Sequence, residues 1–250
     1  MTITGLRKSF GGIAAVQGVD ITVPKGRIVA IIGPNGSGKT TLFNLITGMI
    51  PADEGSVVVD GRELVGLRPD QVYAAGLSRT FQTLELFRPL SLEDHLLIGM
   101  QRRSRVGLLA ACLGLPRVRR EEASLREAVR GVFRRFEDRL TEDRWGDRAD
   151  SLSYANRRRL EIARAVAAEP KVLLLDEPAA GMNPHERAEL TAAIGALRDD
   201  GFTILLIEHH MELISSISDH VVALDQGRKI AEGTPREVLE HPRVVEAYLG

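Results

Sequence analysis

The sequence predicts an α/β fold whose core is a largely parallel sheet. Three runs that are apolar almost throughout carry this prediction, namely Ile28–Ile32, Val172–Asp176 and Thr203–Ile207. Strands of a parallel sheet have this composition because helices cover both of their faces, whereas half-exposed strands alternate apolar with polar residues. Helical patterns separate the runs, and such an alternation of strand with helix is typical of α/β proteins.

Further elements are predicted in chain order around these strands. Short β-rich patterns dominate the start, where Val57–Leu64 contains an Asp-Gly turn signal between two extended runs. Helical patterns follow at residues 157–170 and 184–201, and the second ends in glycine, a common stop signal. Residues His220–Gly233 predict a late hairpin that turns at Asp225–Gly227.

The middle of the chain, Gly99–Asp150, differs in character. Arginine is dense there, acidic residues are interleaved with it, and no apolar strand run occurs. Apolar residues recur at helical spacing, at Leu125, Val129, Val132, Phe133 and Phe136. We interpret this region as a mainly helical lobe inserted into the α/β core, with the charges on a solvated helix face. The apolar run Val106–Leu115 either packs inside this lobe or forms an exposed patch, and Cys112 within it is expected to be a small apolar filler.

Bulk composition narrows the function classes. The 250 residues are 44% hydrophobic and 27% charged, with a net charge of -1, so no overall field favours a nucleic-acid partner. A single cysteine excludes a disulfide framework and favours a reducing compartment. The N-terminus lacks the apolar core of a signal peptide, and no apolar stretch outside the strand patterns reaches the roughly 20 residues of a membrane span.

The segment GPNGSGKTT, residues Gly33–Thr41, matches the phosphate-loop pattern G-x-x-x-x-G-K-[ST]. It follows an apolar strand and precedes a helical pattern, which is the context that the motif requires. Glycines let backbone N–H groups close around phosphate oxygens, Lys39 reaches the β and γ phosphates, and the Thr40 hydroxyl ligates Mg²⁺. The predicted nucleotide contacts are Gly33, Pro34, Asn35, Gly36, Ser37, Gly38, Lys39, Thr40 and Thr41.

Two adjacent carboxylates, Asp176 and Glu177, end the second apolar run. In a phosphate-loop protein the carboxyl end of this strand lies beside the phosphates, where Asp176 would bind Mg²⁺. Glu177 would then act on the water that attacks the γ-phosphate. A simple polar strand cap is the alternative, but two adjacent acids would repel each other there without a cation.

At this point the sequence resembles the ATPase subunits of ABC transporters over nearly its whole length. The landmarks besides the phosphate loop and the acid pair are Gln82 in RTFQ, the signature-like segment Ser151–Ala165, the D-loop-like Ala180–Asn183, His209 in IEHHM, and Phe10 in RKSFGG. The resemblance implies a mixed-sheet P-loop core, an N-terminal antiparallel β subdomain and an inserted helical subdomain. It places one ABC ATPase domain over residues 1–250, with about 1–82 and 168–250 as the core plus β subdomain and about 83–167 as the helical subdomain.

The resemblance also implies roles. Gln82 would reach the Mg²⁺ site, His209 would contact the γ-phosphate and the attacking water, and Phe10 would stack on adenine. Ser153 and Ala155 would bind ATP that an opposing subunit carries. The expected catalytic residues are therefore Glu177, His209, Gln82 and Lys39, and the expected metal ligands are Thr40, Gln82 and Asp176. ATP and Mg²⁺ are the implied cofactors.

Several positions depart from the family pattern. Ala155 and Asn156 stand where the signature has glycine and glutamine, and alanine adds a methyl group where backbone must approach phosphate. The arginines at 157–159 lie near a helix N-terminus, where cations are disfavoured. We therefore interpret the signature as weakened. His210 replaces the aspartate that usually follows the switch histidine.

A finer resemblance is to the LivG-like ATPases of branched-chain amino acid importers. It rests on the LSY signature, on Gly181 and Asn183, on the arginine-rich middle and on the tail AEGTPREVLEHPRVVEAYLG. It implies an ATPase at the cytoplasmic face of a bacterial inner membrane, partnered by two transmembrane permease subunits and a second ABC ATPase, as a heterodimer or a homodimer. An extracytoplasmic solute-binding protein would act indirectly. The implied cargo is branched-chain or other hydrophobic amino acids. The alternatives are a lipopolysaccharide-export-type ABC ATPase and a soluble ABC ATPase of cofactor assembly.

Overall fold

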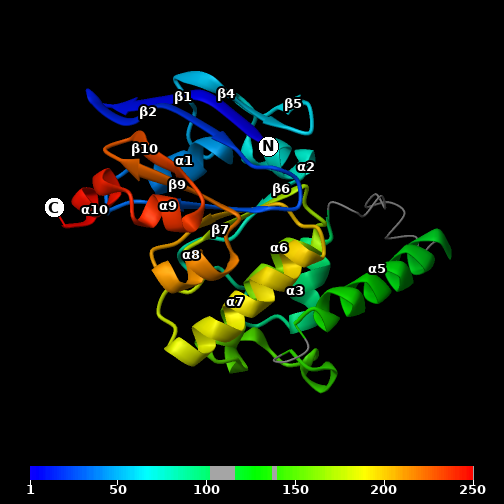
Figure 1. Ribbon diagram of the computed structural model, residues 1–250. Helices are drawn as coiled ribbons and strands as arrows, with labels where there is room; N and C mark the ends of the chain where they lie inside the picture. Colours follow the sequence, from blue (N-terminus) through cyan, green and yellow to red (C-terminus); the bar gives the residue numbers. More distant parts are fainter. Residues whose placement is uncertain (102–115, 137–139, 250) are drawn as a thin grey trace. The chain divides into compact units, whose positions relative to one another are not determined.

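The computed structural model describes residues 1–101, 116–136 and 140–249, which form two compact units. The core unit comprises Met1–Gln82 and Lys171–Gly250, and the helical unit comprises Thr83–Pro170 (Figure 1). No helix of the described residues is both long and apolar enough to cross a bilayer.

A mixed sheet of six strands is the centre of the core unit. Its order is β10-β9-β3-β8-β7-β6, and all neighbours are parallel except the edge pair β9 and β10. The strands are β3 (Ile28–Ile32), β6 (Leu77–Arg79), β7 (Val172–Asp176), β8 (Ile204–Ile207), β9 (His220–Asp225) and β10 (Arg228–Gly233). The three apolar runs are therefore adjacent parallel strands, which confirms the predicted fold class. Their carboxyl ends meet at one edge, where the site residues lie.

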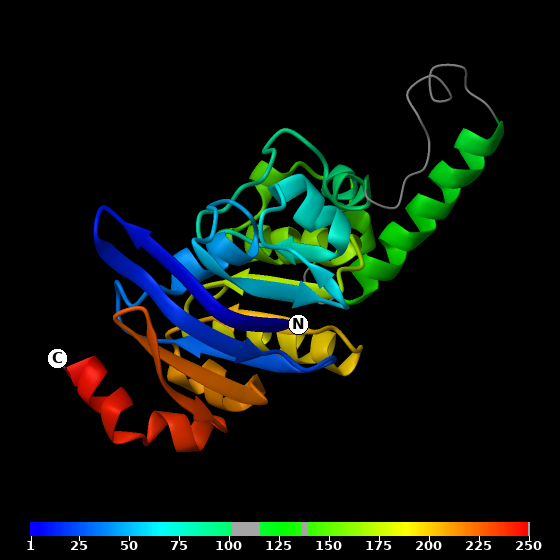
Figure 2. The same ribbon diagram turned by 90° about the horizontal axis from the view of Figure 1, so that it is seen from above.

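A second, antiparallel sheet lies at the N-terminus, with the order β2-β1-β4-β5. Its strands are β1 (Thr2–Phe10), β2 (Ile13–Thr22), β4 (Glu54–Val59) and β5 (Arg62–Glu63). The predicted Asp-Gly turn joins the last two, and Asp60 has a φ of 51°, in the left-handed region. Figure 2 shows β1 and β2 running side by side.

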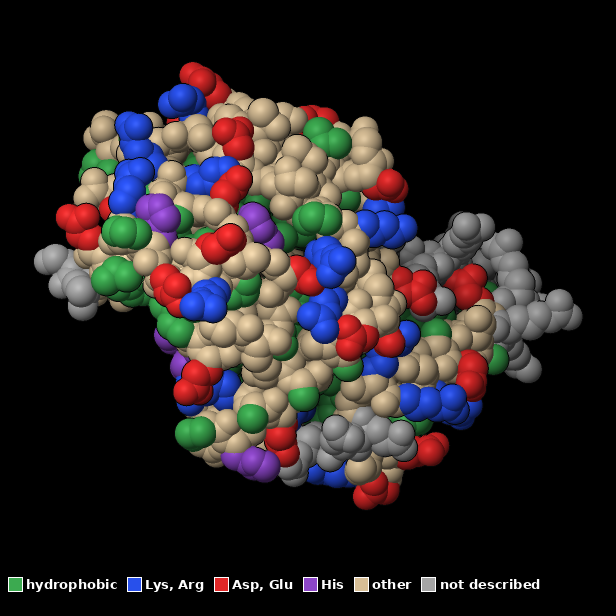
Figure 3. Space-filling view, in the orientation of Figure 1, with side chains coloured by type: hydrophobic (Ala, Val, Ile, Leu, Met, Phe, Trp, Pro, Cys, Tyr) green, Lys and Arg blue, Asp and Glu red, His purple; other side chains and the backbone are tan. Residues whose placement is uncertain are grey.

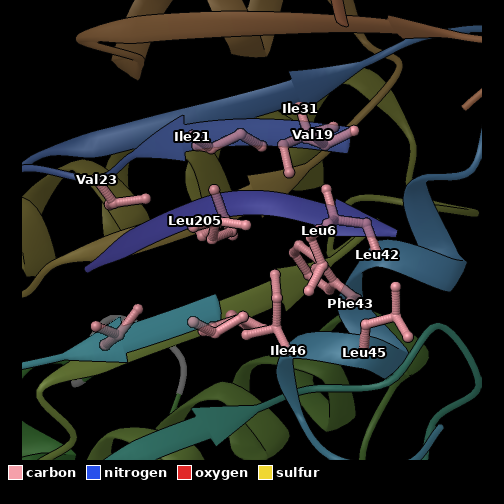
Figure 4. Close-up of a cluster of buried hydrophobic side chains, with 14 of the residues drawn as sticks. Leu6, Val19, Ile21, Val23, Ile31, Leu42, Phe43, Leu45, Ile46 and Leu205 are labelled. Atoms are coloured by element: carbon pink, nitrogen blue, oxygen red, sulfur yellow. The ribbon is translucent and has the colours of Figure 1, made fainter. Parts of the chain in front are cut away.

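The main apolar core of this unit contains side chains of both sheets and of α1 (Lys39–Ile46). Figure 4 shows Leu6 of β1 and Ile21 of β2 near Ile31, Leu205 and Phe43. The other face of β3 is covered too, because its alternate residues pack in a second cluster beneath the C-terminal helices. Burial on both faces explains why β3 has no polar residue.

Two helices of the core unit begin with side-chain caps. Asn183 caps the predicted helix 184–201, which the structure gives as α7 (Pro184–Asp199), through a reciprocal pair of hydrogen bonds with Glu186. Thr234 and Glu237 do the same for a later helix. The remaining helices are α2 (Pro69–Ala75), α8 (Met211–Ile217), α9 (Pro235–Leu239) and α10 (Pro242–Leu249).

The helical unit contains α3 (Leu92–Gly99), α5 (Pro116–Arg134) and α6 (Tyr154–Ala167), with short 3₁₀ turns at Glu142–Arg144 and Ala149–Ser151. Helix α6 starts three residues before the predicted residue 157, because Ser153 caps it. The spacing predicted for the middle region is confirmed on α5, where Val129, Val132 and Phe133 are buried, while Leu125 is half-buried. Ion pairs such as Arg130 with Glu127 occupy its outer face. The run Val106–Leu115, with Cys112, lies outside the described residues.

Candidate functional site

The phosphate loop connects β3 to α1 and depends on glycine at several positions. Gly33, Gly36 and Gly38 have φ values of 151°, 82° and 100°, which side chains rarely tolerate. A Cβ on Gly33 would lie 2.1 Å from the Leu224 carbonyl oxygen, and one on Gly38 would lie 2.5 Å from that of Ala15. Packing against neighbouring strands therefore requires these two glycines. Nothing lies within 4 Å of a Cβ on Gly36, so that position has room beside it.

Lys39 binds the loop that precedes it. Its ammonium Nζ donates to the carbonyl oxygens of Gly33 at 2.7 Å and Pro34 at 2.9 Å, and the residue is buried. Burial lowers the pKa of Lys39, while the negative charges of Glu177 and Asp176 oppose that shift. The ammonium thus lies within the field of the predicted acid pair, at the start of α1.

Asp176 is buried and forms an ion pair. Its Oδ2 lies 2.8 Å from a guanidinium nitrogen of Arg79, the last residue of β6. The same arginine donates to Asn44 Oδ1 at 2.7 Å and to Thr47 Oγ1 at 3.2 Å, both near the end of α1. Its guanidinium also lies 5.0 Å from the ring centre of Phe81. Our reading of the sequence missed Arg79, although an arginine that ends a strand next to an acidic strand end could have indicated the pair.

Three predicted catalytic side chains meet at one carboxylate oxygen. Gln82 Nε2 donates to Glu177 Oε2 at 3.1 Å, and His209 Nδ1 lies 3.9 Å from the same oxygen. Glu177 itself has a φ of 46°, an unusual conformation for a residue with a side chain, and its backbone N–H donates to Ile207 O. The acid, the glutamine and the histidine therefore lie together at the carboxyl edge of the sheet.

Glu208 is a fully buried acid that connects the loop after β7 with the loop after β8. Its Oε1 accepts the Ala179 N–H at 3.0 Å, and its Oε2 accepts the N–H groups of His209 at 2.8 Å and His210 at 3.1 Å. His210 Nδ1 lies 2.8 Å from the same Oε2. This explains how a histidine is accommodated at position 210. Glu208, His209 and His210 are spaced closely enough for a metal ion, but these hydrogen bonds already occupy the Glu208 oxygens.

The predicted Mg²⁺ ligands have suitable chemistry. A threonine hydroxyl, a carboxylate and a side-chain amide are oxygen donors of the kind that Mg²⁺ prefers. Thr40 is exposed on the first turn of α1, and the Oδ1 of Asp176 takes no part in the ion pair with Arg79. The residues present therefore fit the ion.

The remaining predicted nucleotide contacts are Phe10 in the core unit and Ser153 and Ala155 in the helical unit. Phe10 ends β1, is 44% exposed, and has the Lys8 ammonium 5.5 Å from its ring centre. Ser153 and Ala155 belong to the helical unit, where Ser153 Oγ accepts the Asn156 N–H and Ala155 is buried.

Two of the three arginines after the signature, Arg158 and Arg159, have partners within the same helix. Arg158 forms a fully buried ion pair with Glu161 at 2.7 Å, and Arg159 donates to Asn156 Oδ1 at 2.8 Å. The side chain of Asn156, which is shorter than the glutamine of the family pattern, therefore accepts a hydrogen bond within its own helix. Arg158 and Arg159, near the N-terminus of this helix, therefore have partners inside the protein.

Comparisons with known proteins agree with this geometry. The profile of the ABC transporter family matches residues 16–180, and a profile described as branched-chain amino acid ATP-binding cassette transporter matches residues 228–250. The high-affinity branched-chain amino acid transport ATP-binding protein BraF of Pseudomonas aeruginosa is 42% identical over 253 residues, covering 100% of this chain and 97% of BraF. LivG of Escherichia coli K12, described in the same words, is 39% identical over 251 residues with the same coverage.

Solved structures of ATP-binding cassettes share the fold of this chain. A nucleotide-free ATP-binding cassette from an ABC transporter superposes with a TM-score of 0.84 at 32% identity, covering 100% of this chain and 98% of that one. An ATP-binding cassette in its ADP conformation superposes with a TM-score of 0.85 at 33% identity and the same coverage.

Proposed function

The chain belongs to the ABC transporter family as an ATP-hydrolysing subunit, and from this premise we propose that it powers an importer of branched-chain amino acids. Full-length similarity to relatives with that name supports the substrate class. The observation that carries the chemistry is the convergence of Gln82 and His209 on the Glu177 carboxylate beside the phosphate loop.

In the proposed reaction, water attacks the γ-phosphate of ATP in line with the leaving oxygen. Glu177 polarises this water, and His209 and Gln82 orient the water and the carboxylate. The amides of the phosphate loop and Lys39 stabilise the charge that develops on the phosphate oxygens. Lys39 would exchange the carbonyl oxygens of Gly33 and Pro34 for those of the phosphates.

Thr40, Asp176 and Gln82 are the proposed ligands of Mg²⁺, which when bound neutralises charge on the phosphates. Arg79 would keep the Asp176 carboxylate in place whether or not the metal is present, because it binds Oδ2 from the side of β6. Phe10 is the proposed stacking partner of the adenine ring, since its ring is exposed.

We propose that the subunit assembles with two permease subunits and a second ABC ATPase, at the cytoplasmic face of a bacterial inner membrane. Ser153, which is exposed, would contact ATP that the second ATPase carries, while the buried Ala155 would lie beneath this contact. An apolar pocket that includes Phe81, the sequence neighbour of Gln82, supports a permease contact, because a short permease segment could insert there. Its lining residues are Thr47, Met49, Pro69, Val72, Tyr73, Leu77, Arg79 and Phe81.

Other partner classes have less support. Basic and acidic side chains of the described residues are interspersed on the face drawn in Figure 3, which does not favour nucleic acid. Lipopolysaccharide export and cofactor assembly use ABC ATPases with similar motifs, but the tail match at residues 228–250 favours the importer group.

Recovery of the complex from its host tests the proposed assembly. The chain would be tagged in its own host and purified from gently solubilised membranes, and mass spectrometry would identify its partners. We expect two permeases and a second ABC ATPase. Recovery with soluble proteins only would contradict the importer and favour a cofactor-assembly ATPase.

A further inference from the structure

The last helix of the chain contacts the first residue of the phosphate loop. The backbone N–H of Gly33 donates to the hydroxyl oxygen of Tyr248, on α10, at 2.8 Å. The carbonyl oxygen of Gly33 in turn accepts the Lys39 ammonium at 2.7 Å. One glycine therefore connects a C-terminal tyrosine to the phosphate-loop lysine.

Helix α10, which carries Tyr248, is held in place by packing, while the tyrosine itself is 38% exposed. Val238 of α9 and Val244 of α10 are both buried, in a cluster with Ala30 and Ile32 of β3. Figure 1 shows α9 and α10 (red) following β10. Because β3 is the strand that leads into Gly33, the two helices pack on the strand that ends where Tyr248 makes its contact.

The hydrogen bond to Tyr248 satisfies a buried backbone donor, the N–H of Gly33. Gly33 is buried, follows the last residue of β3 and has a φ of 151°, so its N–H needs a partner from elsewhere in the fold. The phenol oxygen of Tyr248 provides this acceptor, and partial burial of the hydroxyl raises the pKa of Tyr248. The C-terminal part of the chain makes a second contact, because the Gly227 N–H donates to Ser37 O at 3.0 Å.

We propose that Tyr248 is a positioning residue for nucleotide binding, which fixes the Gly33 peptide and with it the start of the phosphate loop. The C-terminal segment thus pre-organises the loop before ATP arrives. This reduces the ordering cost that binding would otherwise carry. The inference rests on nucleotide binding at this loop and is independent of the transported solute.

A purely structural role for Tyr248 predicts a different result. If the tyrosine only anchored α10, its loss would lower the stability of the helix and leave nucleotide affinity of the folded protein unchanged. Tyr248→Phe separates the two roles, because it retains the ring and removes only the hydroxyl. Val245→Ala is the matched control, since Val245 is on the same helix and is 42% exposed.

Equilibrium binding of a fluorescent ATP analogue to the full chain gives the first readout. We expect Tyr248→Phe to raise the dissociation constant about 3- to 10-fold, the effect of one lost hydrogen bond. In ATPase assays of the complex, KM for ATP should rise while kcat stays within about twofold. Val245→Ala should leave both values unchanged. An unchanged dissociation constant in folded Tyr248→Phe would overturn the proposal.

Amide exchange gives a direct second readout. Labelling isoleucine carbonyl carbons with ¹³C and glycine amides with ¹⁵N selects the glycines that follow isoleucine, which are Gly33, Gly99 and Gly195. We expect the Gly33 amide to be protected from exchange in the wild-type protein and to exchange about 3- to 10-fold faster in Tyr248→Phe. Gly195, inside α7, should not change and so reports that the variant is folded.

The wild-type protein alone can also overturn the proposal. If its Gly33 amide exchanged as fast as an unstructured one, the contact with Tyr248 would be absent. Failure of the wild-type chain to bind the nucleotide analogue would instead contradict the ATPase function, so the two failures are distinguishable.

Discussion

Arg79 and Asp176 form a buried ion pair at the carboxyl edge of the six-stranded sheet, with 2.8 Å between the guanidinium nitrogen and Oδ2. Their side chains are only 6% and 3% exposed. Asn44 and Thr47 of the α1 end accept from the same guanidinium, so Arg79 ties the acid-bearing strand to the helix that follows the phosphate loop. The predicted metal ligand is thereby given a fixed orientation.

Breaking this pair should be costly. Arg79→Met leaves a buried, uncompensated carboxylate, so we expect the free energy of unfolding to fall by about 3–5 kcal/mol. Urea unfolding followed by circular dichroism measures the change. Arg126→Met, which removes half-exposed pairs with Glu93 and Glu122, is the control and should cost less than about 1 kcal/mol. Equal losses in the two variants would refute the structural importance of the Arg79 pair.

Glu177 should be required for turnover and dispensable for binding. Glu177→Gln keeps the size of the side chain and removes its basicity, so we expect kcat to fall at least about 100-fold. Binding of ATP should be retained, as read from equilibrium titration. Glu240→Gln, on the exposed end of α9, is the control variant and should hydrolyse ATP normally. Normal hydrolysis by Glu177→Gln would show that another group acts as the base.

Glu208 should act through the loop that bears His209. Glu208→Gln replaces an acceptor oxygen by an NH₂ group that faces backbone donors, so we expect a loss of stability of about 2–3 kcal/mol and a lower kcat. Glu212→Gln, exposed in the first turn of α8, is the matched control. Steady-state ATPase assays below the unfolding temperature separate the two effects. Wild-type kcat in folded Glu208→Gln would contradict this positioning role.

The helical unit should lose stability in acid because of His95. This residue is buried on α3, where its Nε2 accepts the Phe87 N–H at 3.1 Å and its Nδ1 lies 2.7 Å from Ser91 O. Burial, together with the charge of Arg164, lowers the pKa of His95 below its ordinary value of 6.5, although Ser91 O and Asp94 oppose the shift.

Because the unfolded chain protonates this imidazole and the folded chain resists protonation, the free energy of unfolding should fall as the pH drops below 6.5. Unfolding midpoints between about pH 7.5 and 5 measure the slope. His95→Gln should reduce the slope, while His185→Gln, on an exposed part of α7, should leave it unchanged. A slope that His95→Gln does not alter would assign the acid sensitivity to other groups.

Local patterns predicted the sheet, the phosphate loop and the acid pair, whereas Gln82 and His209 were predicted from the family resemblance. The apolar runs predicted parallel strands because a strand that is buried on both faces has an apolar side chain at every position, as in Ile28–Ile32. The acid pair was recognisable because the phosphate loop predicts bound phosphates and Mg²⁺ at the carboxyl end of the strand, where Asp176 and Glu177 lie. The helical patterns placed the starts of α6 and α7 within three residues of their positions in the structure.

Other features depend on contacts between distant segments. Tyr248 and Gly33 are 215 residues apart, and nothing in the local sequence of either residue indicates the other. Glu208 resembles any acid after a strand until the fold brings Ala179 to its carboxylate. The arginines after Ser153 were expected to be disfavoured near a helix N-terminus, whereas Arg158 pairs with Glu161 one turn away. Tertiary packing determines which side chains pair in this way, and the periodicity of apolar residues along the sequence does not predict it.

Uptake of labelled leucine by a host strain that lacks this chain tests the central claim most directly. The account predicts that the wild-type chain restores ATP-dependent uptake and that Glu177→Gln, expressed at the same level, does not. Uptake that persists without the chain, or that Glu177→Gln restores, would contradict its assignment as the ATP-hydrolysing subunit of a branched-chain amino acid importer.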